Sequence, residues 1–142
     1  MGVFAAIAGA NRKDFSSTDP RVVESALAYA TERLRLCGLS TGSVETFRLA
    51  LLEAVGNVVR HAAGKAHDFS ISVASRRKNA VVEVVDHGPG FELRSPRMPH
   101  AFAEGGRGVP IMQRLLDSVE YRQSADGNRL ILKLRIREEE RG

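Results

Sequence analysis

The chain contains 142 residues, 43% of them hydrophobic and 27% charged, with a net charge of +4 and a single cysteine, a composition typical of a soluble globular domain that needs no disulfide. No segment reaches the ~18 consecutive apolar residues of a membrane span, and the apolar opening of the chain lacks the basic region of a signal peptide, so we expect a cytoplasmic protein with no membrane contact. The basic residues are dispersed and are not gathered with aromatic residues on one helix, which favours a solvated surface or an acidic protein partner over direct nucleic-acid binding.

Two amphipathic helices are predicted in the first half of the chain. Asp19 and Pro20 have the pattern of an N-cap and a first helical residue, and Gly38 provides a C-terminal stop. Between these signals, apolar residues recur at helical spacing: Val23, Leu27, Ala30, Leu34 and Cys37. This pattern predicts that Cys37 is a buried structural thiol. A second helix is predicted from about Ser43, and its apolar side consists of Phe47, Leu51, Ala54, Val55 and Val58.

The hydrophobic period then changes from that of a helix to that of strands. Residues 69–73 alternate between apolar and polar, which predicts a strand, and the polar residues 76–79 predict a hairpin turn. The apolar run 80–85 predicts a central, buried strand. Residues 87–106 have no period and are rich in Gly and Pro, and a loop of that length in a compact domain is usually functional.

The last third of the chain predicts a helix and a second hairpin. The helix is expected over 109–119, and strands at 120–124 and 129–136 flank Asp126-Gly127, a strong turn signal. A further strand is allowed ahead of the first helix. We therefore expect one domain over residues 1–142 with an α+β fold, a two-layer sandwich in which a mixed, mostly antiparallel sheet is covered by helices on one face.

Three polar residues in the second predicted helix share one face. Glu53, Asn57 and His61 are spaced four residues apart, which places them in line along the helix. A carboxylate and a carboxamide oxygen on one face can serve a hard cation or a reacting hydroxyl. For this segment alone, a solvated polar face is the more frequent explanation.

An acidic residue ends the central strand and is followed by spaced glycines. Asp86 lies directly after the apolar run, and Gly88 and Gly90 allow the backbone to bend closely past a ligand. A carboxylate there can accept a hydrogen bond from an amino group such as that of adenine. For this segment alone, a tight turn with an incidental Asp explains the pattern equally well.

A glycine-rich loop, Gly105-Gly106-Arg107-Gly108, opens the third predicted helix. Free backbone N–H groups at a helix start bind anions such as phosphate, and Arg107 adds a positive charge. The loop is not a Walker A sequence, because no Gly-Lys-Ser/Thr follows it. Taken alone, this loop is a weak signal.

In this order, the three segments resemble the N, G1 and G2 boxes of the Bergerat-fold (GHKL) ATPases. The chain is most similar to the single-domain anti-sigma-factor serine kinases, on the Glu-x-x-x-Asn-x-x-x-His segment at 53–61 and the Gly-Arg-Gly-Val-Pro-Ile-Met segment at 106–112. The resemblance covers about residues 15–136. It implies a protein serine kinase that uses ATP and Mg²⁺, binds a sigma factor and phosphorylates a small STAS-type anti-anti-sigma antagonist, and it also implies a homodimer.

The resemblance further implies roles for the residues of the N and G1 boxes. Asn57 would hold Mg²⁺ through its side-chain oxygen, and Glu53 would orient or deprotonate the attacking hydroxyl. Asp86 would accept a hydrogen bond from the adenine amino group. For His61, a structural hydrogen bond at the helix end and a contact to the nucleotide are both compatible with the resemblance.

The glycine-containing segments would complete the cofactor site. Gly88 and Gly90 would shape the adenine pocket, and residues 91–105 would form the ATP lid. Gly106 and Gly108 would offer backbone N–H groups to phosphate, with Arg107 beside them.

The chain departs from this family at two places. The family usually has a Thr shortly after the glycine of the last hairpin, where it supports the adenine site, whereas here Asn128 and Arg129 follow Gly127. The predicted lid is short and contains Pro96 and Pro99. Neither departure removes a predicted metal-binding or base residue.

Two other functions remain open at this stage. One is a nucleotide-binding anti-sigma module without kinase activity, although nucleotide binding alone does not require the carboxylate of Glu53. The other is a detached catalytic domain of a histidine kinase, although no phosphoacceptor helix is expected before residue 19.

Overall fold

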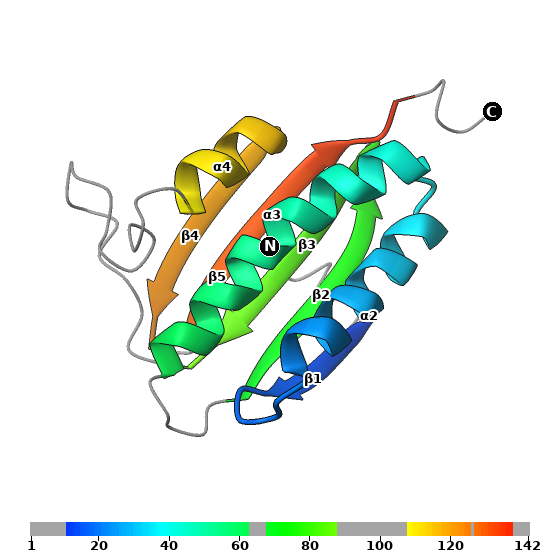
Figure 1. The fold of residues 1–142 in the computed structure, drawn as a ribbon. Coiled ribbons are helices and arrows are strands. Elements are labelled where there is room, and N and C mark those ends of the chain that lie inside the picture. The colour runs from blue at the N-terminus through cyan, green and yellow to red at the C-terminus, as the bar shows by residue number, and fades with distance from the viewer. Residues whose placement is uncertain (1–10, 63–67, 88–107, 126, 138–142) are drawn as a thin grey trace.

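A computed structural model of the chain describes residues 11–62, 68–87, 108–125 and 127–137. Its elements in chain order are β1 (Arg12–Ser16), α2 (Val22–Leu36), α3 (Thr41–Ala62), β2 (Asp68–Arg76), β3 (Asn79–Asp86), α4 (Gly108–Leu115), β4 (Ser118–Ser124) and β5 (Gly127–Arg135). The five strands form one sheet in the order β1-β2-β3-β5-β4, and each pairing between them is antiparallel. The helices cover one face of the sheet (Figure 1). The predicted α+β two-layer fold is therefore confirmed, including the additional strand ahead of the first helix.

The first predicted hairpin is confirmed, and its turn has the geometry that a tight hairpin needs. β2 pairs with β3 from Phe69 opposite Asp86 to Arg76 opposite Asn79. The connecting residues Arg77 and Lys78 have φ values of 50° and 68°. Positive φ at both central residues is the pattern of a type I′ turn, whose twist matches that of the strands beside it.

The prediction that Asp19 and Pro20 begin the first helix is wrong. Helix α2 begins at Val22 with Arg21 as its N-cap residue. The Asp19 carboxylate instead accepts a hydrogen bond from the Arg21 backbone N–H at 2.9 Å, which forms a local turn before the helix. The C-terminal stop was predicted correctly, because Gly38 adopts a φ of 98°. Cys37, predicted to be buried, is only half-buried, and this burial raises the pKa of its thiol while the nearby Arg33 lowers it less.

The boundaries of the other helices also differ from the prediction. Helix α3 begins two residues early, at Thr41, because the Ser40 hydroxyl caps it by accepting the Ser43 backbone N–H at 3.1 Å. Helix α4 ends at Leu115, and Val119 belongs to β4 instead of the helix. None of the described helices, including the 22-residue α3, combines the length and the apolar character needed to cross a membrane.

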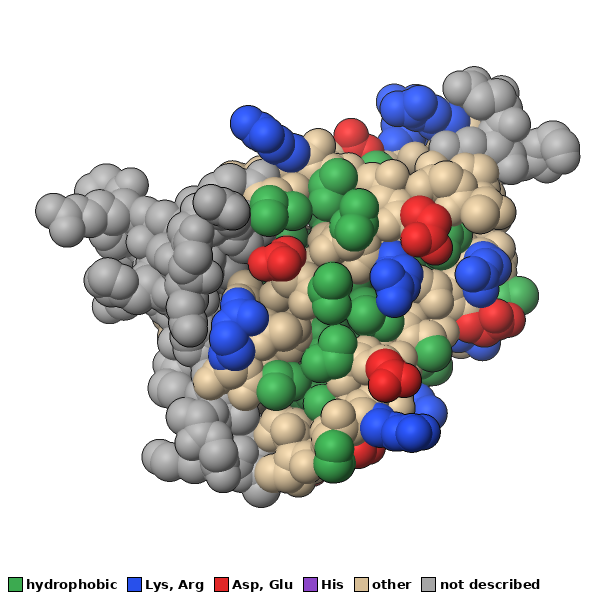
Figure 2. Space-filling view, viewed as in Figure 1, with side chains coloured by type: hydrophobic (Ala, Val, Ile, Leu, Met, Phe, Trp, Pro, Cys, Tyr) green, Lys and Arg blue, Asp and Glu red, His purple; other side chains and the backbone are tan. Residues whose placement is uncertain are grey.

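The main core lies between the helices and the sheet. Its largest fully buried side chains are Leu34, Phe47, Leu51, Phe69, Ile71, Met112, Leu132 and Ile136. They include Leu34 from the apolar side predicted for the first helix and Phe47 and Leu51 from that of the second, whereas the predicted Val23 and Cys37 are only partly buried. Apolar side chains also appear among charged ones on the outer face of the helix layer (Figure 2). Leu36 in α2 and Leu49 in α3 are 64% and 51% exposed.

A buried ion pair lies on the sheet face that the described helices do not cover. Glu83 is only 1% exposed, and its Oε1 accepts a hydrogen bond from Arg129 at 3.0 Å, between the neighbouring strands β3 and β5. Its Oε2 has no hydrogen-bond partner among the described residues. Burial raises the pKa of the Glu83 carboxyl, and the Arg129 guanidinium opposes that rise without cancelling it.

This raised pKa predicts the direction in which pH changes stability. A carboxyl whose pKa is raised by folding binds more protons in the folded state, so the free energy of unfolding falls as pH rises from the ordinary carboxyl pKa through the raised one. The free energy of unfolding of Glu83→Gln should therefore be close to that of the parent near pH 4. Toward pH 7 it should exceed that of the parent, as measured by urea unfolding.

The control is Glu120→Gln, which removes a carboxylate from the more exposed pair with Arg122. This variant should show a smaller change with pH relative to the parent. A constant difference between Glu83→Gln and the parent across the pH range would show that Glu83 has the same pKa in the folded and unfolded chain.

Candidate functional site

Three elements bring the predicted site residues to one end of the molecule. Helix α3 ends where strand β3 ends and where β5 begins (Figure 1). Glu53 and Asn57 lie in the second half of α3, and Asp86 is the last residue of β3. The fold therefore places the N-box and G1-box residues at the same end of the helix and sheet layers.

Asn57 does not lie on a solvated face. It is 1% exposed, because its helix position places it beside the apolar residues that pack on the sheet. Its Nδ2 has no hydrogen-bond partner among the described residues. A buried amide left without a partner costs about 1–3 kcal/mol, so a polar residue is retained here at the expense of stability. Such an unsatisfied group favours a ligand-binding role over a structural one.

Arg60, which was not among the predicted site residues, is part of this site. The guanidinium group of Arg60, one helical turn after Asn57, donates a hydrogen bond to Asn57 Oδ1. A cation that bound the same oxygen would have to displace this guanidinium. The spacing of three residues between Asn57 and Arg60 was a usable signal for this contact.

Glu53 lies one helical turn before Asn57 and is half-buried. It is therefore less enclosed than Asn57 and remains accessible to a reacting group. His61 lies in the last turn of α3, and its side chain is outside what the structure describes.

Asp86 is held by a residue from the neighbouring strand. Asp86 and Asn128 are directly opposite in the β3–β5 register, and Asn128 Nδ2 donates a hydrogen bond to Asp86 Oδ1 at 3.0 Å. Because side chains alternate along a strand, Asp86 continues the series of Val82 and Val84 that faces the helices. Its carboxylate is thus on the same side of the sheet as α3.

From the sequence, Asn128 was only a departure from the family pattern, with no predicted role in the site. It is 4% exposed, and its amide orients the carboxylate of Asp86. The sequence contained no local signal for this role, since the two residues are 42 positions apart.

Gly127 allows the second hairpin to pass close to the end of β3. Its φ is 131°, and a Cβ atom at this position would lie 2.8 Å from the carbonyl oxygen of Asp86 and 2.9 Å from Nδ1 of His87. Any larger residue would push the end of β3 away. The turn glycine identified in the sequence therefore also sets the position of Asp86.

Several predicted site residues cannot be placed. Gly88, Gly90, Gly106 and Arg107 lie outside the described residues, as does the predicted lid at 91–105. Gly108 is the first residue of α4, consistent with a glycine-rich segment that opens a helix.

The described residues contain no ready-made metal cage. Among them, no group of three or more His, Cys, Asp and Glu side chains is placed to hold a metal ion. A metal at Asn57 would depend on that amide oxygen together with oxygens of a bound ligand. Mg²⁺ is commonly held in this way, by a few protein oxygens and the phosphates of a substrate.

Comparison with known protein families matches residues 16–134 to the histidine kinase-like ATPase domain. The match extends from the end of β1 almost to the end of β5, so it includes every site residue discussed above. Among curated proteins, no match to the chain was found.

Proposed function

Because this chain belongs to the histidine kinase-like ATPase domain family, whose members bind ATP, we propose that it is a cytoplasmic protein serine kinase that uses ATP and Mg²⁺. It binds a sigma factor and phosphorylates a small STAS-type antagonist of the anti-sigma factor. The observation that carries this proposal is the position of Asn57, which is buried and whose Nδ2 has no partner among the described residues, one helical turn from the half-buried Glu53.

The nucleotide is recognised at the end of the sheet. Asp86, oriented by Asn128, accepts a hydrogen bond from the adenine amino group. Mg²⁺ bound with ATP neutralises phosphate charge as the phosphoryl group is transferred. Asn57 would hold that metal through Oδ1, the oxygen that now accepts a hydrogen bond from Arg60, and the Arg60 guanidinium would then be free to pair with the phosphates.

Glu53 acts on the protein substrate. Its carboxylate accepts the proton of the substrate serine as the serine Oγ forms a bond to the γ-phosphorus. The bond between that phosphorus and the β–γ bridging oxygen breaks, and ADP leaves with the electron pair. A half-buried position suits this role, because the carboxylate must reach a hydroxyl group that another protein brings.

The two competing functions differ in their products. A nucleotide-binding anti-sigma module would bind ATP and the sigma factor without transferring phosphate. A histidine-kinase catalytic domain would form phosphohistidine, which is labile in acid, whereas phosphoserine is stable in acid. Incubation with radiolabelled Mg-ATP and a STAS-type antagonist should give an acid-stable label on the antagonist. An acid-labile label, or none at all despite tight ATP binding, would overturn the kinase proposal.

Asn57→Ala is expected to weaken binding of Mg-ATP by about tenfold or more, because one metal ligand is lost. The free energy of unfolding should change by only about 1 kcal/mol, since the lost hydrogen bond to Arg60 is partly offset by removal of the unsatisfied amide. Titration calorimetry with and without Mg²⁺ measures the first effect and urea unfolding the second.

The matched control is Asn79→Ala, in the hairpin turn at the far end of β3. Its affinity for Mg-ATP should equal that of the parent. Equal affinities in Asn57→Ala and the parent would remove Asn57 from the metal site.

A further inference from the structure

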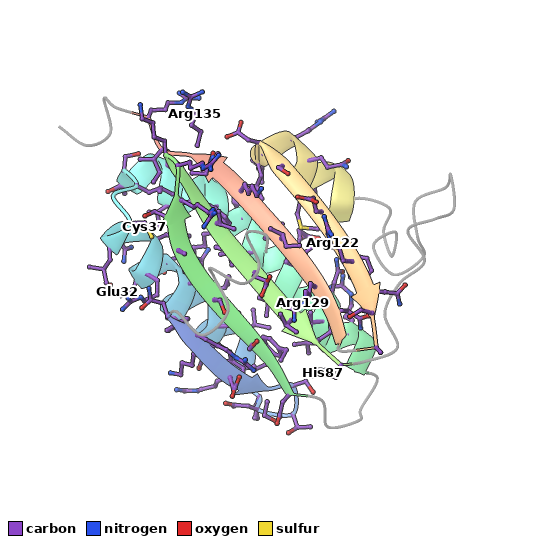
Figure 3. The ribbon with its side chains drawn as sticks, turned by 180° about the vertical axis from the view of Figure 1, so that it is seen from behind. Glu32, Cys37, His87, Arg122, Arg129 and Arg135 are labelled. Atoms are coloured by element: carbon purple, nitrogen blue, oxygen red, sulfur yellow. The ribbon has the colours of Figure 1, made fainter. Side chains whose placement is uncertain are left out.

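A polar cavity lies at the opposite end of the molecule from Asp86. It has a volume of about 620 Å³ and is bounded by the start of α3, the end of α4 and the residues at the end of β5. Figure 3 shows this separation, because Arg135, which lines the cavity, and His87, which follows Asp86, lie at opposite ends of the sheet. The cavity is therefore distinct from the proposed nucleotide site.

The cavity carries an excess of positive charge. Arg114, Arg135 and Arg137 line it, and among the described residues on its wall only Asp117 carries a carboxylate. This carboxylate accepts the backbone N–H of Arg135 at 2.7 Å. Among the described residues, none of the three guanidinium groups has an ion-pair partner. All three arginines are exposed, so a carboxylate of an acidic ligand can reach each of them and form an ion pair.

The rest of the wall limits the kind of acidic ligand. Leu115, Leu116 and Leu134 contribute apolar surface, and Ser43 and Thr46 contribute polar groups from α3. The volume suits a ligand much larger than a phosphate ion. None of the described residues that line the cavity is aromatic, so this part of the wall offers no stacking surface of the kind with which proteins hold single-stranded nucleic acid.

We propose that this cavity is a docking site for an acidic segment of a partner protein, one that combines several carboxylates with apolar side chains. The carboxylates pair with the three arginines, and the apolar side chains cover the leucine wall. The excess of basic over acidic residues in the whole chain, 21 to 17, supports an acidic partner. The inference concerns a site apart from the nucleotide and does not require that the protein transfer phosphate.

The test uses a fluorescein-labelled peptide of alternating Glu and Leu, with fluorescence anisotropy as the readout. The full chain is used, so that the acidic run Glu138-Glu139-Glu140, which follows Arg137 in sequence, is present. Any competition between this run and the peptide is then the same in the parent and in each variant. Arg114→Gln combined with Arg137→Gln should weaken peptide binding by roughly tenfold, as expected for loss of charge pairs in a partly enclosed site. Thr46→Glu, which adds a carboxylate to the wall without removing a guanidinium, should also weaken it.

The matched control is Arg21→Gln combined with Arg122→Gln, two exposed arginines outside the cavity whose replacement changes the net charge equally. This control should weaken binding less than about twofold, since exposed charges far from a ligand are screened by salt. Retained ATP binding checks that each variant is folded.

Three results would overturn the proposal. Equal losses in the cavity and control variants would mean that the peptide is attracted only by net charge. A single-stranded oligonucleotide that binds more tightly than the peptide, and with the same dependence on Arg114 and Arg137, would identify nucleic acid as the ligand. Absence of peptide binding by the parent at low salt would exclude an acidic docking site.

Discussion

Replacing Glu53 by Gln is expected to leave ATP and sigma-factor binding nearly unchanged while phosphoryl transfer falls by on the order of 10²–10⁴, the usual contribution of a positioned general base. Gln keeps the size and hydrogen-bonding reach of Glu but cannot accept the serine proton. Because Glu53 is only half-buried, this substitution should also leave the fold intact. A loose transition state needs less help from a base, so a loss near the lower bound is compatible with the role.

The measurement is single-turnover phosphorylation of a STAS-type antagonist at saturating Mg-ATP. Glu45→Gln is the matched control, because Glu45 is exposed on the same helix and lies before the predicted site. Its transfer rate should match that of the parent. Unchanged transfer in Glu53→Gln would remove the base assignment, and equal losses in both variants would indicate a general effect of charge on α3.

Replacing Asp86 by Ala is expected to abolish the preference for ATP over GTP and to lower ATP affinity by roughly 10- to 100-fold. A hydrogen bond to a charged acceptor contributes about 1.5–3 kcal/mol, and a site built around that acceptor loses its discrimination when the acceptor is absent. The variant also leaves the buried Asn128 amide without the oxygen to which it now donates at 3.0 Å. We therefore expect a fall of about 1–3 kcal/mol in the free energy of unfolding.

Asp86→Asn separates the loss of recognition from the loss of stability. It keeps a side-chain oxygen for Asn128 but presents an N–H donor where the adenine amino group needs an acceptor. Competition titrations with ATP and GTP should show the same loss of selectivity as Asp86→Ala, with stability closer to that of the parent. If both variants still prefer ATP as strongly as the parent, adenine is recognised elsewhere.

Most of the fold was predictable because its signals are local. The alternation at 69–73 and the apolar run at 80–85 identified the central strands, and Gly38 identified the end of α2, since each depends on residues close in sequence. Helix starts were less predictable. Asp19 and Pro20 have the composition of a helix start, yet the Asp19 carboxylate is already used by the Arg21 backbone N–H before the helix begins.

The site was predictable only in part, because only its local sequence signals could be recognised. Glu53, Asn57 and Asp86 were identified because their motifs are continuous in the chain. The burial of Asn57 was not predicted, because the helical period places this residue at the boundary between the apolar and polar sides of the helix. Which side of that boundary is covered depends on the elements that pack against α3, and these come from distant parts of the sequence.

The sequence by itself determined the element types, the two hairpin turns and the positions of the N and G1 motifs, because these follow from local periodicity and from backbone conformations that few residues adopt. Only the tertiary structure decided that Asn128 holds Asp86, and that Arg114, Arg135 and Arg137 line one cavity. The first arrangement depends on the register of β5 against β3, and the second on how the fold brings together α3, α4 and the end of β5. These long-range pairings are selected by the burial of whole faces, so no short stretch of sequence can specify them.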